Sequence, residues 1–236
     1  MKIYYDFHVH TCLSPCGDSD MTPNNIINMA IIKGRDAIAI TDHNTYHNAE
    51  ACIEAARGCN LTVIPGMEVE TAEEIHVVTL FPDMNALSAF GEEISATMPP
   101  VKNKPEIFGE QIVMNSKDEF VRFEERYLLT ACSLGIYEIF DKVIQLGGVP
   151  IVAHIDKSSY SVISSLGCIP DDIPISTVEI KNKNYLSDPG NAMSVKKYNT
   201  IHNSDAHYLW DISEKDNFLE CESNDIKCIL NKLKSK

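Results

Sequence analysis

Paired histidines and acidic residues follow several of the segments whose sequence is typical of strands. His8 and His10 end the first of these segments, and Asp205 and His207 follow the last. Because side chains alternate along a strand, the two members of each pair point to the same side. Imidazole nitrogens and carboxylate oxygens are common ligands of transition metals. The two pairs therefore predict a metal site.

Residues of the same kinds lie at the ends of other expected strands. Thr41-Asp42-His43 follows the second strand, Glu68 ends the third and His154 ends the fifth. His76 lies near the start of the fourth, where an antiparallel strand after the short segment 70–74 would bring it to the same edge. Because reactive residues collect at the carboxyl ends of parallel strands, we expect these side chains to converge.

Short β-branched segments alternate with amphipathic segments along the chain. Strands are expected at Ile3–His8, Asp36–Thr41, Leu61–Val69, Ile75–Phe81, Val149–His154, Thr177–Lys181 and Thr200–Asn203. Helices are expected at Asn24–Lys33, Asn48–Arg57, Met84–Ala96, Gly135–Leu146, Ala192–Tyr198 and Asp225–Lys234. This alternation predicts an α/β fold with a parallel sheet, in a single domain over residues 1–236.

Residues 98–131 break the alternation. The segment contains Pro99-Pro100, Pro105 and a mixed charge run, with little periodicity before Phe120. We expect it to be an insertion between the fourth and fifth strands that forms a lid or a sheet edge.

The composition limits the class of protein. The formal net charge is −14, and no broad basic stripe is present, so a long nucleic acid is not the expected partner. Bound cations would still admit an anionic substrate. No apolar run long enough to span a membrane occurs, the N-terminal segment reads as a strand, and the eight cysteines contain no C-x-x-C. We therefore expect a cytoplasmic protein; the oligomeric state is left open.

The order of these motifs resembles the PHP family, named for polymerase and histidinol phosphatase domains. The resemblance covers nearly the whole chain and rests on the H-x-H block, T-D-H, the G-x-E block with its following His, and the final D-x-H. It implies a distorted (β/α)7 barrel, two or three divalent metal ions, and hydrolysis of phosphoester bonds. The metal ligands that it implies are His8, His10, His43, Glu68, His76, His154, Asp205 and His207. Glu68 would bridge two of the metals.

One position departs from the family pattern. Family members often have His or Asp a few residues after the H-x-H pair, whereas this chain has Cys16 six residues after His10. A thiolate is a soft ligand and would favour zinc or iron over magnesium. Cys16 is our first candidate for this position, Asp18 is the second, and a site that uses neither residue is the third possibility.

Other polar residues could support the metals or hold the substrate. Lys157 follows His154 closely and could bind a phosphate as a point charge, with Asn44 and Lys181 as further candidates. Asp6 and Asp42 lie beside expected ligands and could orient imidazoles. Both could equally serve as turn or cap carboxylates.

These features together predict a metal-dependent phosphoesterase acting on a small phosphorylated metabolite or nucleotide. Two or three ions of zinc, manganese or iron would hold a bridging hydroxide, and Asp205 would ligate one ion and accept a proton. No G-x-S-x-G motif or P-loop offers another route. Two alternatives remain, namely a 3′-5′ exonuclease or oligonucleotide phosphodiesterase, and a metal-binding regulatory module without turnover.

Overall fold

The computed structural model describes residues 1–235. Its strands are β1 (Lys2–Val9), β2 (Ala37–Ile40), β3 (Thr62–Glu70), β4 (His76–Leu80), β5 (Ile112–Met114), β6 (Phe120–Phe123), β7 (Val149–Val152), β8 (Thr177–Glu179), β9 (Asn199–Ile201) and β10 (Phe218–Glu220). Its α-helices are α1 (Pro23–Ile32), α2 (Ala49–Ala55), α3 (Met84–Thr97), α4 (Pro105–Phe108), α5 (Ile136–Gln145), α6 (Val162–Leu166), α7 (Pro189–Val195) and α8 (Ile226–Lys234). Short 3-10 helices lie at η1 (Lys183–Ser187) and η2 (Leu209–Asp211). Every strand and helix expected from the sequence overlaps one of these elements.

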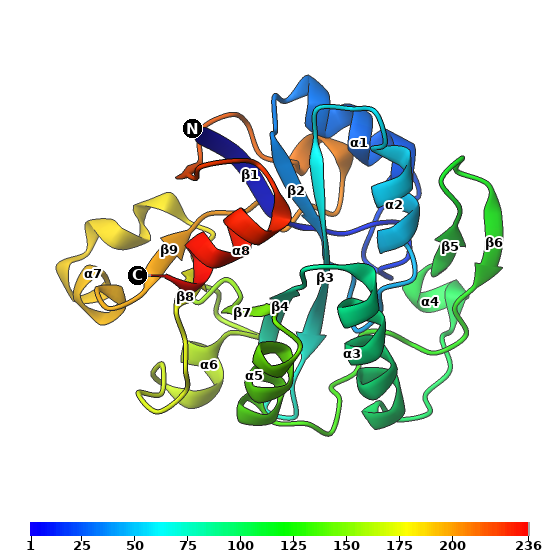
Figure 1. The fold of residues 1–236 in the computed structure, drawn as a ribbon. Helices are drawn as coiled ribbons and strands as arrows, with labels where there is room; N and C mark the ends of the chain where they lie inside the picture. The colour runs from blue at the N-terminus through cyan, green and yellow to red at the C-terminus, as the bar shows by residue number, and fades with distance from the viewer. Residues whose placement is uncertain (236) are drawn as a thin grey trace.

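Eight strands form one curled sheet in the order β10-β1-β2-β3-β4-β7-β8-β9 (Figure 1). The runs β1-β2-β3 and β7-β8-β9 are parallel, whereas β4 is antiparallel to both of its neighbours. Ala206, which follows β9, pairs with Val9 at the end of β1. This contact joins the two halves of the sheet at one end, so the fold is the expected distorted α/β barrel, here with a mixed sheet.

The antiparallel β4 is confirmed, and it solves the placement of His76. A tight turn, closed by a hydrogen bond from the Thr71 amide to the Ile75 carbonyl (2.9 Å), joins β3 to β4. His76 then pairs with Glu70 at the carboxyl end of β3. The first residue of β4 therefore lies at the same edge as Glu68.

One end of the barrel interior is apolar and is closed by α8. The buried cluster there contains Ile3, Tyr5, Phe7, Ile64, Val78, Leu80, Ile151, Ile229, Leu230 and Leu233. The hydroxyls of Thr62 and Thr177 donate to the carbonyls of Asn224 and Leu233 at 2.7 and 2.6 Å. Since these threonines begin β3 and β8, α8 covers the amino ends of the strands. The carboxyl ends remain for polar side chains.

An irregularity in β1 changes which of its side chains face the barrel interior. The odd-numbered side chains of Ile3–Phe7 join the apolar interior. The pairing of β1 with β2 then shifts register between Asp6 and Val9. Within and after this irregularity, His8 and His10 face the polar end, which a strictly alternating strand would not allow.

The segment 98–131 lies in sequence between β4 and β7, where the insertion was expected. It contains α4 and the β5–β6 ribbon, which stands apart from the main sheet in Figure 1. Asn48 ties the ribbon to the barrel by donating to the Ile112 carbonyl (3.0 Å) and accepting from the Met114 amide (2.9 Å). Its role as a lid stays a prediction. Among the described residues, no helix is both long and apolar enough to cross a membrane.

Candidate metal centre

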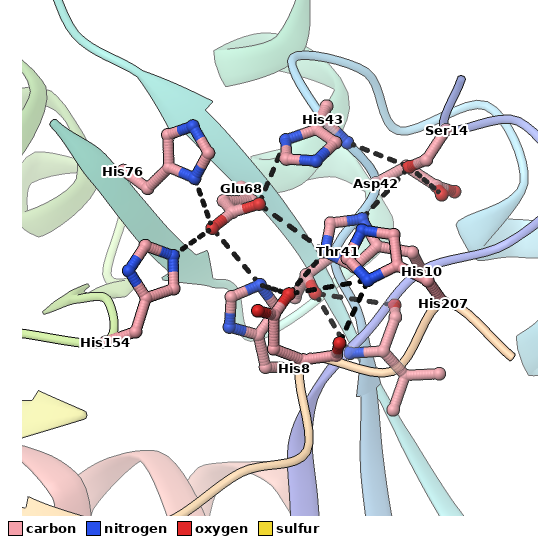
Figure 2. A network of polar contacts seen from close by, with 12 residues as sticks. His8, His10, Ser14, Thr41, Asp42, His43, Glu68, His76, His154 and His207 are labelled. Atoms are coloured by element: carbon pink, nitrogen blue, oxygen red, sulfur yellow. Dashed lines mark hydrogen bonds and ion pairs between the residues drawn. The ribbon is translucent and has the colours of Figure 1, made fainter. Parts of the chain in front are cut away.

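The Glu68 carboxylate lies at the centre of the polar end and is fully buried (Figure 2). Imidazole nitrogens surround it at 2.9–3.4 Å, from His8, His76 and His154 around Oε1 and from His10 and His43 around Oε2. Each oxygen therefore faces its own set of nitrogens. This is the arrangement that a carboxylate needs to bridge two cations.

Asp205 extends the cluster on the side of His10. Its Oδ1 atom lies 3.5 Å from His8 Nε2, 3.4 Å from His10 Nε2 and 3.7 Å from His207 Nδ1. The rings of His10 and His207 stack with centroids 4.2 Å apart. The eight residues expected to converge thus lie in one connected cluster.

The other oxygen of Asp205 faces two lysines. Its Oδ2 atom accepts hydrogen bonds from Lys157 Nζ at 2.6 Å and from Lys181 Nζ at 3.3 Å. Both lysine side chains are about two-fifths exposed (40% and 41%). Asp205 therefore separates the buried imidazoles from a positively charged rim.

The donor atoms of the cluster fit metal ions. Buried polar atoms normally find hydrogen-bond partners, and leaving one unpaired costs about 1–3 kcal/mol. Here His8 Nε2, His10 Nε2, His43 Nδ1 and Glu68 Oε2 are buried without one. Three groups have ligand atoms within 4.8 Å of one another, namely His8 with His10 and Glu68, His43 with Glu68 and His76, and His10 with His43 and His207. Unpaired nitrogens and carboxylate oxygens at this spacing could hold two or three cations.

The electrostatics of Glu68, Asp205 and His10 favour the protonation states of metal ligands. Burial opposes ionisation of Glu68, but the imidazoles, with His76 first, outweigh it and hold the pKa of Glu68 well below its usual range. The same balance, with His8 as the first counter-charge, lowers the pKa of Asp205 far below its usual range. Burial and the neighbouring imidazoles lower the pKa of His10 well below its usual value. At neutral pH both carboxylates are ionised and His10 is neutral.

Glu179 supports the cluster from outside and was missed in the sequence. Both of its oxygens lie 3.1 Å from His8 Nδ1, and it also accepts from the His154 amide (3.1 Å) and from Asn203 Nδ2 (2.6 Å). With Nδ1 donating to Glu179, His8 directs the lone pair of Nε2 at the cluster. The available signal was an acidic residue inside the short apolar strand Thr177–Lys181.

Ser14 links Asp42 to His10. The Ser14 hydroxyl donates to Asp42 Oδ1 at 2.7 Å and lies 3.0 Å from His10 Nδ1, from which it accepts. Asp42 also accepts from the amide and hydroxyl of Thr11 at 2.7 and 2.8 Å. Asp42 therefore orients an imidazole through a serine. Asp6 instead accepts from the backbone amides of Ser204 and Ser213, so it fastens the segment after β9 to β1.

The structure assigns Asn44 a role different from the expected one. Its side-chain amide donates to the carbonyls of Leu128 (2.8 Å) and Thr130 (3.1 Å), and its oxygen accepts from the Glu70 amide (3.0 Å). Both amide hydrogens are used and the residue is buried. Asn44 therefore fastens the segment 98–131 to the barrel, and these contacts leave neither of its amide hydrogens for a substrate.

Cys16 and Asp18 lie beside the cluster and belong to none of the three groups of described ligand atoms. Both line a cavity of about 360 Å³ that reaches Tyr208. Desolvation of the Cys16 thiol, followed by the Glu68 carboxylate, raises its pKa to about 12, although the residue as a whole is exposed. Asp18 Oδ1 accepts from the Asp20 amide in a local turn (2.9 Å). Neither residue is joined to the imidazoles by a hydrogen bond or an ion pair.

Backbone strain accompanies two of the cluster residues. His154 (φ 27°) and Asp205 (φ 51°) both adopt left-handed conformations. Such conformations are unfavourable for residues other than glycine and are retained where the surroundings determine them. Here they turn each side chain inward from the end of a strand.

The PHP domain family model matches residues 6–159. The chain belongs to the PHP domain family. This stretch contains six of the eight clustered residues, whereas Asp205 and His207 lie beyond it.

Curated relatives of the chain include the 5′-3′ exoribonuclease Rnm of Salmonella typhimurium, which is 38% identical over 87 residues. That alignment covers 33% of this chain and only 27% of the exoribonuclease. Among solved structures, the lesion-specific endonuclease PfuEndoQ of Pyrococcus furiosus has a TM-score of 0.74 at 18% identity, over 99% of this chain and 56% of that one. An amidohydrolase of Chromobacterium violaceum has a TM-score of 0.60 at 15% identity and 91% coverage of both chains. These two structures share the fold.

Proposed function

We propose that this chain is a metal-dependent hydrolase of phosphoester bonds. The observation that carries the proposal is a buried carboxylate, Glu68, placed between two sets of imidazole nitrogens, three of which have no hydrogen-bond partner. Membership of the PHP family supports the same conclusion.

The proposed metal ligands are His8, His10, His43, Glu68, His76, His154, Asp205 and His207. Glu68 is the proposed bridge, and zinc, manganese and iron are the candidate metals, because imidazole-rich sites suit these ions. When bound, two or three such ions would activate water and neutralise the phosphoryl oxygens.

The chain's own residues would bind the phosphate and move the proton. Lys157 and Lys181 stand at the exposed side of Asp205 and would hold phosphate oxygens as point charges. When the phosphate draws both lysines away, Asp205 Oδ2 is free to accept a proton from the attacking water. Glu179 and Ser14 would keep His8 and His10 in the required tautomers.

Two substrate classes fit this mechanism. A small phosphorylated metabolite or a nucleotide is the first, since two lysines face the ionised Asp205 and could hold one phosphate group. A terminal phosphodiester of an oligonucleotide is the second. Two of the similar proteins are named as nucleases, so the sequence-based expectation against long nucleic acid has no support from the relatives.

The test is to purify the protein without chelator, measure its metal content and assay phosphomonoesters, phosphodiesters and 5′- or 3′-labelled single-stranded oligonucleotides. We expect about two to three ions per chain and hydrolysis of at least one class. Chelation should remove this activity, and manganese, zinc or iron should restore it. Full metal content without any hydrolysis would favour a regulatory module, and activity that survives complete metal removal would contradict the proposal.

A further inference from the structure

Tyr160 lies over one of the proposed ligands. Its ring stacks on His76 with centroids 4.9 Å apart and an interplanar angle of 24°. The Tyr160 carbonyl accepts a hydrogen bond from the His76 amide at 3.0 Å. The residue nevertheless remains 47% exposed. A large aromatic surface is therefore fixed beside the cluster and is still open to solvent.

The loop that carries Tyr160 holds the ring in place. Tyr160 has a φ of 55°, in the left-handed region that a tyrosine rarely adopts. The hydroxyl of Ser161, the next residue, donates to the Lys157 carbonyl at 2.7 Å, and the Lys157 amide donates to the His154 carbonyl at 2.9 Å. Backbone strain that the surrounding contacts maintain is common at functional positions, so it indicates that the position of this ring matters for function. A ring that only covered His76 could be buried on its other side, whereas Tyr160 remains partly exposed to solvent.

The same loop supplies a cation for a phosphate. Lys157, three residues before Tyr160, reaches Asp205 at 2.6 Å. The loop therefore presents a positive charge on one side of the cluster and an aromatic face on another. The chain as a whole carries a net charge of −14, so an aromatic contact would add binding energy that does not depend on positive charge. Bases stack on aromatic side chains whatever their identity.

We propose that Tyr160 is the stacking platform for the base of a nucleoside phosphate whose phosphate lies on the cluster and Lys157. This inference deepens the proposed function and rests on it. It makes the preferred substrate a nucleotide or the end of a single strand, and it makes Tyr160 the residue that distinguishes these from sugar phosphates.

The test compares substrates that differ only in the base. With manganese-loaded protein, kcat/KM is measured for AMP and for ribose 5-phosphate, and dissociation constants for both are measured by calorimetry. If diesters are preferred, the pair becomes the p-nitrophenyl ester of thymidine 5′-phosphate and methyl p-nitrophenyl phosphate. We expect Tyr160→Ala to lower kcat/KM and to raise the dissociation constant about tenfold to a hundredfold for the substrate that carries a base. For the substrate without a base, both quantities should change less than about twofold. Tyr160→Phe should restore most of the loss.

Phe218→Ala is the matched control, because Phe218 is 40% exposed and lies on β10 beside the amino end of β1, away from the cluster. This variant should have the wild-type kcat/KM and dissociation constant for both substrates. An equal loss for both substrates with Tyr160→Ala would show that Tyr160 only supports His76, and no loss for either would also overturn the inference. If the wild-type protein hydrolyses nothing, the proposed function fails, and the calorimetric comparison still decides whether Tyr160 binds a base. A much larger effect on oligoadenylate than on AMP would identify a strand end as the ligand.

Discussion

Glu68 is the residue around which the other side chains of the cluster are arranged. A buried carboxylate must be balanced by nearby positive charge, and here the balance comes from five imidazoles on four different segments. In the metal-free chain, some of those imidazoles must be protonated to balance the negative charge of Glu68. Divalent ions would balance this charge directly, and they would also bind the unpaired nitrogens.

Glu68→Gln should test the bridging role. The amide keeps the size of the side chain but removes the charge that two cations would share, and one of its ends cannot serve as a ligand. We expect at least one ion fewer per chain and a loss of several orders of magnitude in kcat. Glu70→Gln is the control, since Glu70 is a neighbouring carboxylate of the same strand outside the three ligand groups. Near-normal turnover by the Glu68 variant would rule out a bridge.

Cys16→Ser should test whether a thiolate holds a third ion. Because the pKa of Cys16 is about 12 in the metal-free chain, its thiol is protonated at neutral pH, and a metal that binds it must release this proton. If Cys16 is a ligand, the variant should lose about one ion and the wild-type occupancy of that ion should fall as the pH falls. Equal metal content in both proteins, measured by elemental analysis, would transfer the prediction to Asp18.

Lys157→Ala should raise KM more than it lowers metal content, because the lysine contacts Asp205 from the exposed side and is not a ligand. We expect a tenfold or larger fall in kcat/KM for a phosphomonoester, since the removed charge would pair with a phosphate oxygen. Lys183→Ala, which removes an exposed lysine paired with Asp216, should behave as wild type. Loss of metal from the Lys157 variant would instead mean that Lys157 organises the cluster.

At the scale of elements, most of the barrel could be predicted because its strands carry their own local signals. The pairs at His8 and His10 and at Asp205 and His207 stood out by their residue types and spacing, and the antiparallel β4 followed from the short turn before it. The orientation of the pairs did not follow from strand periodicity, because β1 is irregular before His8 and Asp205 lies beyond β9 in a left-handed conformation. The features that the sequence did not reveal depend on contacts between distant segments. Asn44 is occupied by residues 128 and 130, and β10 is a three-residue strand that forms only by pairing with β1. Glu179 required knowledge of which face of β8 turns toward His8.

The apolar end of the barrel should depend on α8. Leu230 is only 2% exposed in the cluster that α8 forms with the strands. Leu230→Ala should lower the free energy of unfolding by about 2–5 kcal/mol through lost burial and the cavity left behind. Lys227→Ala on the exposed face of the same helix should change it by less than about 0.5 kcal/mol. Urea unfolding measures both, and kcat at a temperature where the variants are folded should be unchanged.

At the scale of the whole molecule, the cluster joins segments from both ends of the barrel sheet, so metal binding should stabilise the entire fold. Ions that bind only the folded chain would add about 2.7 kcal/mol at a concentration one hundred times Kd. Thermal unfolding with and without manganese or zinc measures this increment. A melting temperature unaffected by either metal would contradict the proposed centre.

The metal-dependent increment should grow as the pH rises. Burial disfavours the charged imidazoles, but Glu179 outweighs it at His8 and Glu68 outweighs it at His76, so both pKa values are raised. In the metal-free chain these raised values stabilise the fold below the ordinary histidine pKa and that contribution is lost as the pH rises. Metals must displace the same protons. The difference in melting temperature between loaded and chelated protein should therefore be larger at pH 8 than at pH 6.

The position of α8 also has a consequence for the order in which the molecule is assembled. Every residue of the cluster precedes α8 in the chain, yet the apolar interior beneath the cluster is closed only when this helix docks against the amino ends of the strands. A nascent chain that has already released His207 from the ribosome would still expose that interior to water and to chaperones. We therefore expect ribosome-bound chains that lack Ile226–Lys234 to be protease-sensitive and unable to retain metal, so that loading of the centre follows translation of this helix.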